Sequence, residues 1–389
     1  MIDRSISRRE FIKLGTMAGT AILAGGALGG GCAHTEREPV PTQLSSGKTV
    51  FGKTDFDVVI VGAGPGGCLA AYRLAGQGFS VGLFDRAPWE AIGKPIVIEA
   101  ERNIFRTVGL PDPTGDLIPY RPERIRVFSP RDRECILIDC RDYPLPMAIR
   151  LDRFTQGLLH EALRCGAHLQ GGYTAISPIY SGRRVNGVRF ETPSGGTAEI
   201  SARLVIDATG FTAALVRQLP PELDMQFPDG IEHVVSADNR LHAIDRSAAE
   251  QAVAAGRHAS DEVWNRLGQY GVYSTVFSYL SLEQGIAYIL IGYRQTYEQQ
   301  TMPVATAVDQ FRRQQGYYGE ELTGGGELIR IHHSLDQPVA DGFLAIGEAA
   351  CQVVPMHASG VSSALYAGHL AARTAGTALR SGDVTTAAL

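Results

Sequence analysis

The sequence has few cysteines, and they form no pattern that binds a structural metal. The six cysteines stand at positions 32, 68, 135, 140, 165 and 351, with no C-x-x-C pair and no Cys/His cluster at zinc spacing. We therefore expect no metal site. Cys135 and Cys140 leave a disulfide open, provided that their Cα atoms come within about 7 Å of each other. The alternative is that the five cysteines after Cys32 are small buried hydrophobic residues.

Long runs of one charge are also absent. The chain has 36 Lys and Arg against 41 Asp and Glu, a net charge of -5, and no extended basic run. Such a chain produces no field that gathers phosphate backbones, so we expect no nucleic acid partner. A hydrophobic content of 44% with 20% charged residues indicates a globular protein, and 389 residues suffice for two domains or one elaborated α/β domain.

The first 32 residues have the composition of an export signal. A basic start with Arg4, Arg8 and Arg9 precedes residues 14–31, which carry no charge. The segment "SRREFIK" (7–13) resembles the twin-arginine signal, which implies export by the twin-arginine machinery to the periplasm or the outer side of the membrane. The alternative is a basic tail before a glycine-rich helix. Seven glycines weaken that helix, which favours a removed signal over a permanent anchor.

The apolar run ends in a sequence that resembles a lipoprotein processing site. In "LGGGC" (28–32) the resemblance implies that Cys32 is acylated and anchors the chain in lipid. Gly29 stands where an aliphatic residue is usual, and Leu28 lies one place too early. Residues 33–54 are polar and contain proline, which predicts a flexible tether without a fold of its own.

A strand, a glycine-rich turn and a helix follow in order from Asp55. The run "DFDVVIV" (55–61) is typical of a strand covered on both faces of a parallel sheet. In the following "GAGPGG", Gly62 allows the tight turn, Gly64 lets a pyrophosphate approach the backbone, and Gly67 lets helix and strand pack closely. The pattern predicts a dinucleotide at the helix N-terminus, bound by the loop that includes Pro65 and Gly66.

A second predicted strand, "SVGLF" (80–84), ends at Asp85, which we expect to accept hydrogen bonds from the adenosine ribose. The alternative is a tight βαβ turn that binds no ligand. This motif alone leaves FAD and NAD both open. Two later stretches bear on the choice: "RLVIDATG" (203–210), a strand that ends in Asp207 and Gly210, and residues 342–372, a strand, a loop and a long helix.

Together these three stretches resemble the FAD-dependent oxidoreductases that include geranylgeranyl reductases, aromatic hydroxylases, lycopene cyclases and flavin-dependent halogenases. The resemblance covers residues 55–380 and implies FAD as cofactor. It implies that the strand before "ATG" lies beside the ADP part, with Asp207 and Gly210 as cofactor-binding residues, and that the last motif holds the ribityl chain and the isoalloxazine ring. The residues that match this last motif are Gly347, Glu348, Pro355, Gly360 and Val361.

Two positions depart from the family pattern or leave it open. Glu348 stands where the family has aspartate, so a carboxylate is kept but an extra methylene must be accommodated. The family places an arginine that contacts FAD at the start of the helix expected within residues 147–170. Arg150 and Arg153 both fit this position, and we select Arg150.

The resemblance also implies the domain organisation. The expected fold is α/β, an FAD-binding Rossmann-type parallel sheet with an inserted antiparallel-sheet substrate domain. Residues 55–115, 147–219 and 331–382 are assigned to the FAD-binding domain, and residues 116–146 and 220–330 to the substrate domain. In the substrate domain, "SAAEQAVAAG" (247–256) and "VATAVDQFRRQQ" (304–315) predict helices on the outer face of the sheet.

Titratable side chains near the expected flavin ring are few. His357 is a candidate acid, and the alternative is a histidine that only packs in the loop. His332 and His333 are expected on a strand, where adjacent side chains face opposite sides and do not form a joint metal site. The W-x-W-x-I-P element of halogenases is absent, and so is a second G-x-G-x-x-G for a separate NAD(P)H domain.

These observations predict an exported FAD-dependent oxidoreductase that transfers hydride to an apolar organic substrate, such as an isoprenoid or lipid. Its electron partner is open, with a quinone or a redox protein as candidates. The alternatives are an aromatic-hydroxylase-like monooxygenase, a redox-neutral flavoprotein that resembles lycopene cyclase, and a flavin-binding protein without turnover. Twin-arginine export carries folded proteins, which agrees with a cofactor inserted before export.

Overall fold

The computed structural model describes residues 54–389 except 131, 133, 141–145, 224, 226, 228–232, 272, 295–301 and 355–357. The predicted signal peptide, the lipidation site at Cys32 and the tether up to residue 53 lie outside the described residues. Pro355 and His357 do so as well.

A mainly parallel sheet forms one half of the molecule. Its strand order is β16-β17-β10-β1-β2-β7, and a hairpin of β8 and β9 continues from β10. Apolar, β-branched runs build its centre, and β1 is paired in parallel on both sides, by β2 and β10. The strands are β1 (Phe56–Val61), β2 (Val81–Asp85), β7 (His168–Gly171), β8 (Thr174–Ser181), β9 (Arg184–Glu191), β10 (Thr197–Asp207), β16 (Val339–Ala340) and β17 (Phe343–Ala345).

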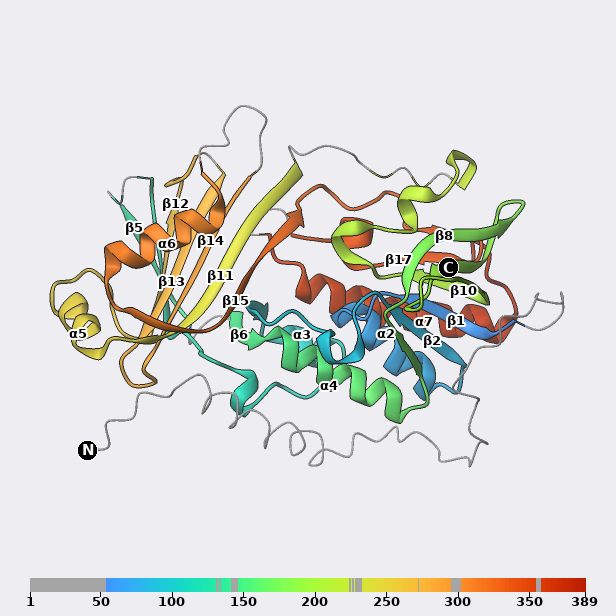
Figure 1. Cartoon of the computed structure of the whole chain (residues 1–389), viewed down its shortest axis with the longest axis horizontal. Coiled ribbons are helices and arrows are strands. Elements are labelled where there is room, and N and C mark those ends of the chain that lie inside the picture. Colours follow the sequence, from blue (N-terminus) through green and yellow to red (C-terminus); the bar gives the residue numbers. More distant parts are fainter. Residues whose placement is uncertain are drawn as a thin grey trace.

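Three helices pack together against this sheet: α2 (Pro65–Gly76), α4 (Leu151–Arg164) and α7 (Val361–Ser381) (Figure 1). Each presents small or aliphatic side chains to one core, which includes Leu69, Leu158 and Leu365. The helix α2 crosses α7 at very short range, because a Cβ on Gly368 would lie 2.3 Å from the Gly66 carbonyl oxygen. The short helix α3 (Asn103–Thr107) borders the same core.

A seven-stranded sheet forms the other half, in the order β15-β11-β14-β13-β12-β4-β5. Its neighbouring strands are antiparallel except for β12 and β4, which are parallel. The strands are β4 (Arg124–Phe128), β5 (Cys135–Asp139), β11 (Val234–Ile244), β12 (Glu262–Leu267), β13 (Ser274–Ser281), β14 (Ile286–Arg294) and β15 (Tyr318–Arg330).

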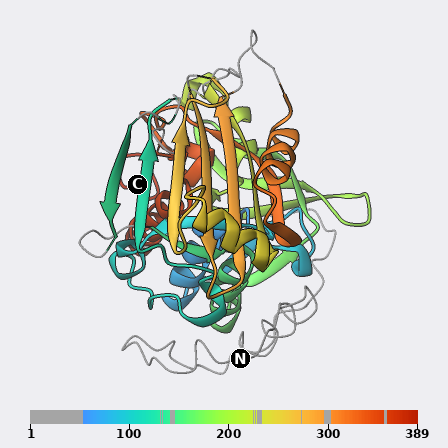
Figure 2. The ribbon, with the colours of Figure 1, turned by 90° about the vertical axis from the view of Figure 1, so that its left-hand side faces the viewer.

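Two helices cover the face of this sheet that points away from the parallel sheet: α5 (Arg246–Ala254) and α6 (Val304–Gln315) (Figure 2). From α6, Val308 and Phe311 pack against Ile289 and Ile291 of β14. The outer position expected for both helices is confirmed. The opposite face of the sheet is left to face the parallel half.

A two-stranded ribbon, β3 (Val97–Glu101) with β6 (Pro146–Arg150), lies between the two halves. On one side it joins the core of the seven-stranded sheet, where the Tyr288 hydroxyl donates to the Val97 carbonyl oxygen at 3.3 Å. On the other side the Glu101 N–H donates to Ser362 Oγ at 3.3 Å, at the start of α7. The ribbon therefore connects the first turn of α7 to the inner face of the second sheet.

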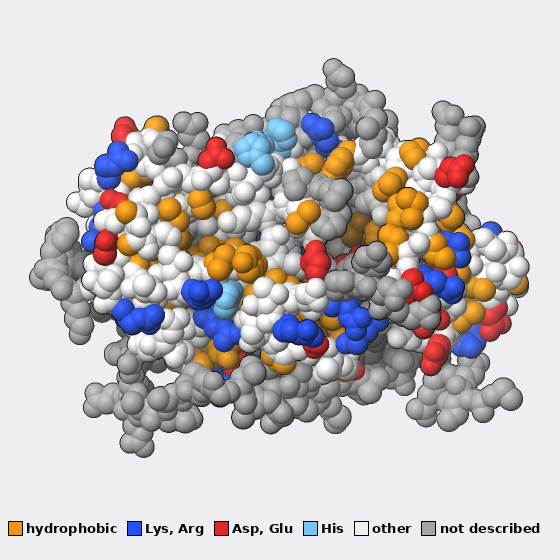
Figure 3. All heavy atoms as spheres, turned by 180° about the vertical axis from the view of Figure 1, so that it is seen from behind, with side chains coloured by type: hydrophobic (Ala, Val, Ile, Leu, Met, Phe, Trp, Pro, Cys, Tyr) orange, Lys and Arg blue, Asp and Glu red, His pale blue; other side chains and the backbone are white. Residues whose placement is uncertain are grey.

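The predicted fold class is confirmed: a Rossmann-type parallel sheet accompanies a second, largely antiparallel sheet. The strands of each sheet come from the segments assigned to the two domains, and the exact boundaries stay a prediction. No helix in the described part of the chain is long and apolar enough to cross a membrane. On the face of the molecule seen in Figure 3, basic and acidic side chains are interspersed.

Two expectations about side chains were wrong. Cys135 is exposed on the edge strand β5 and is not a buried hydrophobic residue, and it forms no disulfide with Cys140, since both are free. His332 and His333 follow the end of β15, and their rings are in contact at 4.0 Å between centroids instead of facing opposite sides. Among the described residues no group of His, Cys, Asp and Glu is arranged to hold a metal ion.

Candidate functional site

One cavity of about 1330 Å³ lies between the two halves of the molecule. It reaches from the glycine loop after β1 to the inner face of the seven-stranded sheet. Most of the predicted cofactor residues in the described part of the chain line it: Gly62, Gly64, Pro65, Gly66, Gly67, Asp85, Gly210, Gly347, Glu348, Gly360 and Val361.

The three motif glycines of the first loop have different surroundings. Gly62 has φ +104°, and a Cβ there would lie 2.3 Å from the Ala208 carbonyl oxygen. A Cβ on Gly67 would lie 2.0 Å from the Gly62 carbonyl oxygen, so this position holds strand and helix together. A Cβ on Gly64 would meet no atom within 4 Å, although Gly64 lines the cavity. The space beside Gly64 is therefore open to a ligand.

The helix α2 presents its N-terminus to this space. Gly64 is its N-cap and supplies no side chain to cap it, and Pro65 follows as the first helical residue. Free N–H groups and the positive end of the helix dipole favour an anion such as a diphosphate. The adjacent Asp85 carboxylate accepts from the Ala63 N–H at 2.7 Å and the Ala87 N–H at 2.8 Å. Each carboxylate oxygen keeps a further lone pair for a ribose hydroxyl.

Asp207 lies outside the cavity lining, although it was predicted to bind the cofactor. It is fully buried, and its carboxylate accepts hydrogen bonds from the backbone N–H groups of Thr209, Leu215 and Val216 and from the Thr209 hydroxyl. These bonds shape the loop after β10. Gly210 stands in that loop at φ +64° and lines the cavity. Asp207 therefore supports the site through the loop.

Glu348 is positioned at the cavity wall by the turn after β17. Its Oε1 accepts from the Arg330 backbone N–H at 2.7 Å. Burial raises the pKa of the Glu348 carboxyl to about 7, while the Arg330 N–H opposes the shift. Gly347, at φ +63°, provides the turn, and its N–H donates to Gln352 Oε1 at 2.8 Å. The longer glutamate is thus accommodated with one oxygen held by the backbone.

Arg150, the selected arginine, does not line the cavity. It is the N-cap of α4, and its guanidinium pairs with the Asp152 carboxylate at 2.7 Å. Leu151 and Thr155 of the same helix line the cavity instead. Thr155 is fully buried, and its hydroxyl has no hydrogen-bond partner in the described part of the chain. A bound ligand with a polar atom at this place would satisfy that hydroxyl.

The part of the cavity beside the seven-stranded sheet is apolar. Alternate residues of neighbouring strands face it, because side chains of a strand alternate between the two faces of the sheet. At its edge, Lys94 and Glu327 form an ion pair at 3.0 Å. The apolar lining includes Ile125, Val127, Ile138, Val235, Phe277, Tyr288 and Leu290. This wall fits a hydrophobic molecule.

Glu99 is a lining residue that the sequence analysis missed. It lies on the ribbon strand β3, and its Oε1 accepts from the Tyr120 hydroxyl at 3.2 Å. Burial raises the pKa of Glu99 to about 7, and the hydrogen bond from Tyr120 acts in the opposite direction. In the sequence, "VIEAE" resembles a half-exposed strand and carries no motif. Only the pairing of β3 with β6 places this carboxyl between the two halves.

A flavin dinucleotide fits the residues present. The open space at Gly64, the uncapped N-terminus of α2 and the buried Thr155 hydroxyl offer contacts to a large polar molecule. Asp85 lies where a ribose is expected, and Gly360 and Val361, at the N-terminal end of helix α7, line the same cavity. Pro355 and His357, also predicted for this end, lie outside the described residues.

Comparisons with known proteins agree with this geometry. A family model described as FAD binding domain matches residues 55–382. The chain is 25% identical over 349 residues to a digeranylgeranylglycerophospholipid reductase of Sulfolobus acidocaldarius, covering 86% of this chain and 72% of that protein. It is 27% identical over 348 residues to the enzyme of the same name from Methanosphaerula palustris, covering 87% of this chain and 80% of that protein.

Solved structures share the fold. A geranylgeranyl bacteriochlorophyll reductase-like protein from Thermoplasma acidophilum has a TM-score of 0.72 at 18% identity, covering 86% of this chain and 81% of that one. The myxobacterial chondrochloren halogenase has a TM-score of 0.61 at 18% identity, covering 84% of this chain and 75% of that one.

Proposed function

Because the chain belongs to the FAD-binding domain family and is an FAD-dependent oxidoreductase, we propose that it reduces carbon–carbon double bonds of an isoprenoid or lipid substrate. The observation that carries the proposal is the continuous cavity that joins the glycine loop to an apolar wall. The names of the curated relatives, which are reductases of geranylgeranyl lipids, support the substrate class.

Different residues of the cavity contact different parts of the cofactor and the substrate. The N-terminus of α2 and the Asp85 carboxylate hold the diphosphate and ribose end, and the Thr155 hydroxyl and Glu348 offer polar contacts farther along. The wall that includes Phe277 and Leu290 excludes water and orients the apolar chain. Bound FAD, once reduced, supplies the hydride for the reaction.

A half-reaction assay tests the proposal directly. The protein is purified with its FAD, photoreduced without oxygen, and mixed in separate experiments with a geranylgeranylated glycerophospholipid, quinone or oxygen, while NADPH is mixed with the oxidised protein. We expect the lipid to reoxidise the flavin without oxygen and to gain two hydrogens per reduced double bond by mass spectrometry. Reoxidation by oxygen alone with a hydroxylated product would favour the monooxygenase. A lipid that is isomerised without flavin oxidation would favour the redox-neutral alternative.

We further propose that the chain acts outside the cytoplasm, exported by the twin-arginine machinery and anchored through an acylated Cys32. The support is the sequence Ser7–Lys13 and the small-residue segment before Cys32. In this location a quinol or a redox protein is the proposed electron donor, because NAD(P)H is a cytosolic carrier. Cell fractionation of the wild type and an Arg8→Lys/Arg9→Lys variant tests this. Equal amounts of both proteins outside the cytoplasm would contradict twin-arginine export.

A further inference from the structure

Reducing a carbon–carbon double bond requires a proton as well as a hydride. The hydride forms a new C–H bond at one carbon, the π electron pair takes up a proton at the neighbouring carbon, and the donor is left as its conjugate base. A group that delivers this proton must face the substrate and be protonated when the hydride arrives. His357, the candidate from the sequence, lies outside the described residues.

Glu99 stands where such a group is needed. It lines the cavity at the ribbon strand β3, two residues from Glu101, whose N–H is bonded to Ser362 in the first turn of α7. The same strand contacts the inner face of the seven-stranded sheet through the bond between Tyr288 and Val97. Glu99 therefore lies on the strand that links the first turn of α7 to the inner face of the seven-stranded sheet, and it lines the cavity there.

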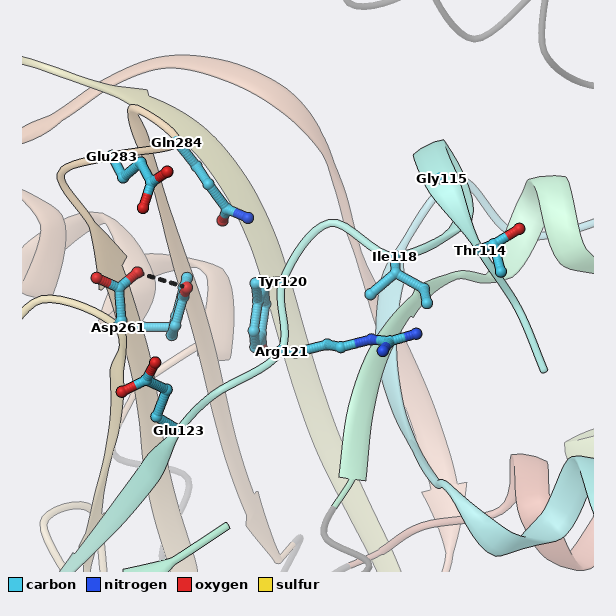
Figure 4. Close-up of a pocket in the computed structure, with 10 residues that line it drawn as sticks. Thr114, Gly115, Ile118, Tyr120, Arg121, Glu123, Asp261, Glu283 and Gln284 are labelled. Carbon is cyan, nitrogen blue, oxygen red and sulfur yellow. Dashed lines mark hydrogen bonds between the residues drawn. The ribbon is translucent and has the colours of Figure 1, made fainter. Parts of the chain in front are cut away.

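A hydrogen bond from Tyr120, whose ring stacks on another tyrosine, positions the Glu99 carboxyl. The Tyr120 hydroxyl donates to Glu99 Oε1, and the Tyr120 ring stacks on Tyr279 at 4.1 Å between centroids with an interplanar angle of 12°. The Tyr279 hydroxyl in turn donates to Asp261 Oδ1 at 3.2 Å. Figure 4 shows Tyr120 and Asp261 in the wall of a second cavity of about 470 Å³. The hydrogen bond from Tyr120 engages Oε1 of Glu99, whose residue also lines the main cavity.

We propose that Glu99 is the catalytic acid that protonates the substrate carbon and that Tyr120 is its positioning residue. The proposal rests on the proposed reductase function, in which reduced FAD supplies the hydride and a quinol or redox protein re-reduces the flavin. In each turnover the Glu99 O–H bond breaks, a substrate C–H bond forms, and the resulting carboxylate takes a proton from water after the product leaves.

The electrostatic surroundings favour the protonated form of Glu99. Burial, with a smaller contribution from the Glu101 carboxylate, raises the pKa of Glu99 to about 7 against the opposing hydrogen bond from Tyr120. In the described part of the chain, Tyr288 and Cys140 also interact with Glu99, and burial raises the pKa of both, so that both stay uncharged near neutral pH. The rate of the protonation step should therefore fall as pH rises through about 7.

The test uses the flavin-loaded protein, photoreduced and then mixed without oxygen with a geranylgeranylated glycerophospholipid. We expect Glu99→Gln to keep its FAD and its photoreduction but to reoxidise about 100-fold more slowly or worse, the usual effect of losing a general acid. Glu283→Gln, an exposed residue of the second cavity, is the matched control and should react like the wild type. If the wild type itself is not reoxidised by the lipid, the proposed function fails. If the wild type reacts and Glu99→Gln reacts equally fast, only the proton donor is refuted.

Tyr120→Phe distinguishes positioning from simple packing. Because the Tyr120 hydrogen bond lowers the pKa of Glu99, its removal should move the alkaline limb of the wild-type pH profile to higher pH. A slower rate with an unchanged limb would contradict the positioning role.

An infrared pH titration provides a readout that does not depend on turnover. The wild type should show a protonated carboxyl band that disappears with a midpoint near 7 and is reduced in Glu99→Gln. Glu348 is expected to titrate in the same range, so Glu348→Gln should retain the Glu99 part of the band. A Glu348→Gln protein without a protonated carboxyl band just below pH 7 would overturn the proposal even if Glu99→Gln did not fold.

Discussion

Gly64 and Gly67 stand three positions apart in one loop, yet a methyl group at each would meet different surroundings. At Gly67 it would collide with the Gly62 backbone, whereas at Gly64 it would project into the cavity. Gly64 has φ -73°, which alanine adopts without strain. We therefore expect glycine to be required for folding at position 67 and for ligand binding at position 64.

We predict that Gly67→Ala destabilises the protein by about 1–3 kcal/mol, as overpacking of a tight contact does. Gly64→Ala should leave the free energy of unfolding of the apoprotein unchanged but weaken FAD binding about tenfold or more, equivalent to about 1.4 kcal/mol. Urea unfolding and fluorescence titration with FAD measure the two effects. Full FAD affinity in Gly64→Ala would contradict a close approach of the cofactor to this loop.

Glu348 allows a prediction about pH. Burial raises its pKa from 4.5 to about 7, so between these values the folded chain keeps a proton that the unfolded chain loses. The free energy of unfolding therefore falls as pH rises through this window. In the apoprotein, the free energy of unfolding of Glu348→Gln relative to that of the wild type should rise by on the order of 1 kcal/mol between about pH 5 and about pH 8. If the stability difference between Glu348→Gln and the wild type were the same at both pH values, a raised pKa of the Glu348 carboxyl would be contradicted.

Residues of the cavity lining were recognisable from the sequence only where a local motif marks them. Gly62, Gly64 and Gly67 are recognisable because their spacing follows from local geometry, a turn and a helix start that neighbouring residues build. Glu99 and Thr155 have no such signal, because their place in the cavity depends on which strand and helix pack beside them. Asp207 illustrates the same limit. Its position at the end of a strand suggested a ligand contact, but its carboxylate accepts hydrogen bonds from the loop that follows.

At the scale of elements, the helices of the seven-stranded sheet are separate from the cavity. Asp245 is the N-cap of α5, and its carboxylate accepts from the Ala248 N–H at 3.0 Å. This helix packs on the outer face of the sheet through Ala249 and Ala252. Its stability should therefore change without any change at the cofactor site.

We predict that Asp245→Ala lowers the free energy of unfolding by about 1 kcal/mol, the usual cost of a lost N-cap. Asp245→Ser, which keeps a capping oxygen, is the matched control and should lose less. FAD content and the rate of photoreduction should equal those of the wild type. A variant that loses FAD would indicate coupling between α5 and the cavity that the contacts do not show.

Elements with a strong local pattern were predicted from the sequence, and elements that depend on distant partners were not. The apolar run of β1, the amphipathic pattern of α4 and the outer helices α5 and α6 are each readable within a short window. The ribbon strand β3 was missed because it is short and "VIEAE" mixes charge with apolar residues. The extension of β15 through Gly324, Gly325 and Gly326 was also hidden, since glycines argue against a strand until a partner such as β11 pairs with them.

At the scale of the whole molecule, the cofactor should hold the two halves together. The cavity is walled by the glycine loop of one half and by the inner face of the other. A ligand that binds only the folded state adds about 2.7 kcal/mol to stability at 100 times its dissociation constant. We predict that removal of FAD lowers the melting temperature and exposes both sheets to faster amide exchange. Protection lost only near the glycine loop would contradict a cofactor that spans the cavity.

The order of strands in the parallel sheet also bears on how the chain is made. Asp55, just before β1, accepts a hydrogen bond from the N–H of Ser201 in β10, 146 positions later, and β17 joins β10 only near the end of the chain. Pairings between such distant segments form slowly, because a long loop must close first. A nascent chain on the ribosome therefore lacks a complete cofactor site until its final segment has emerged. Flavin insertion must then be a late event in biogenesis, and C-terminal truncation upstream of β17 should yield a chain that never acquires its colour.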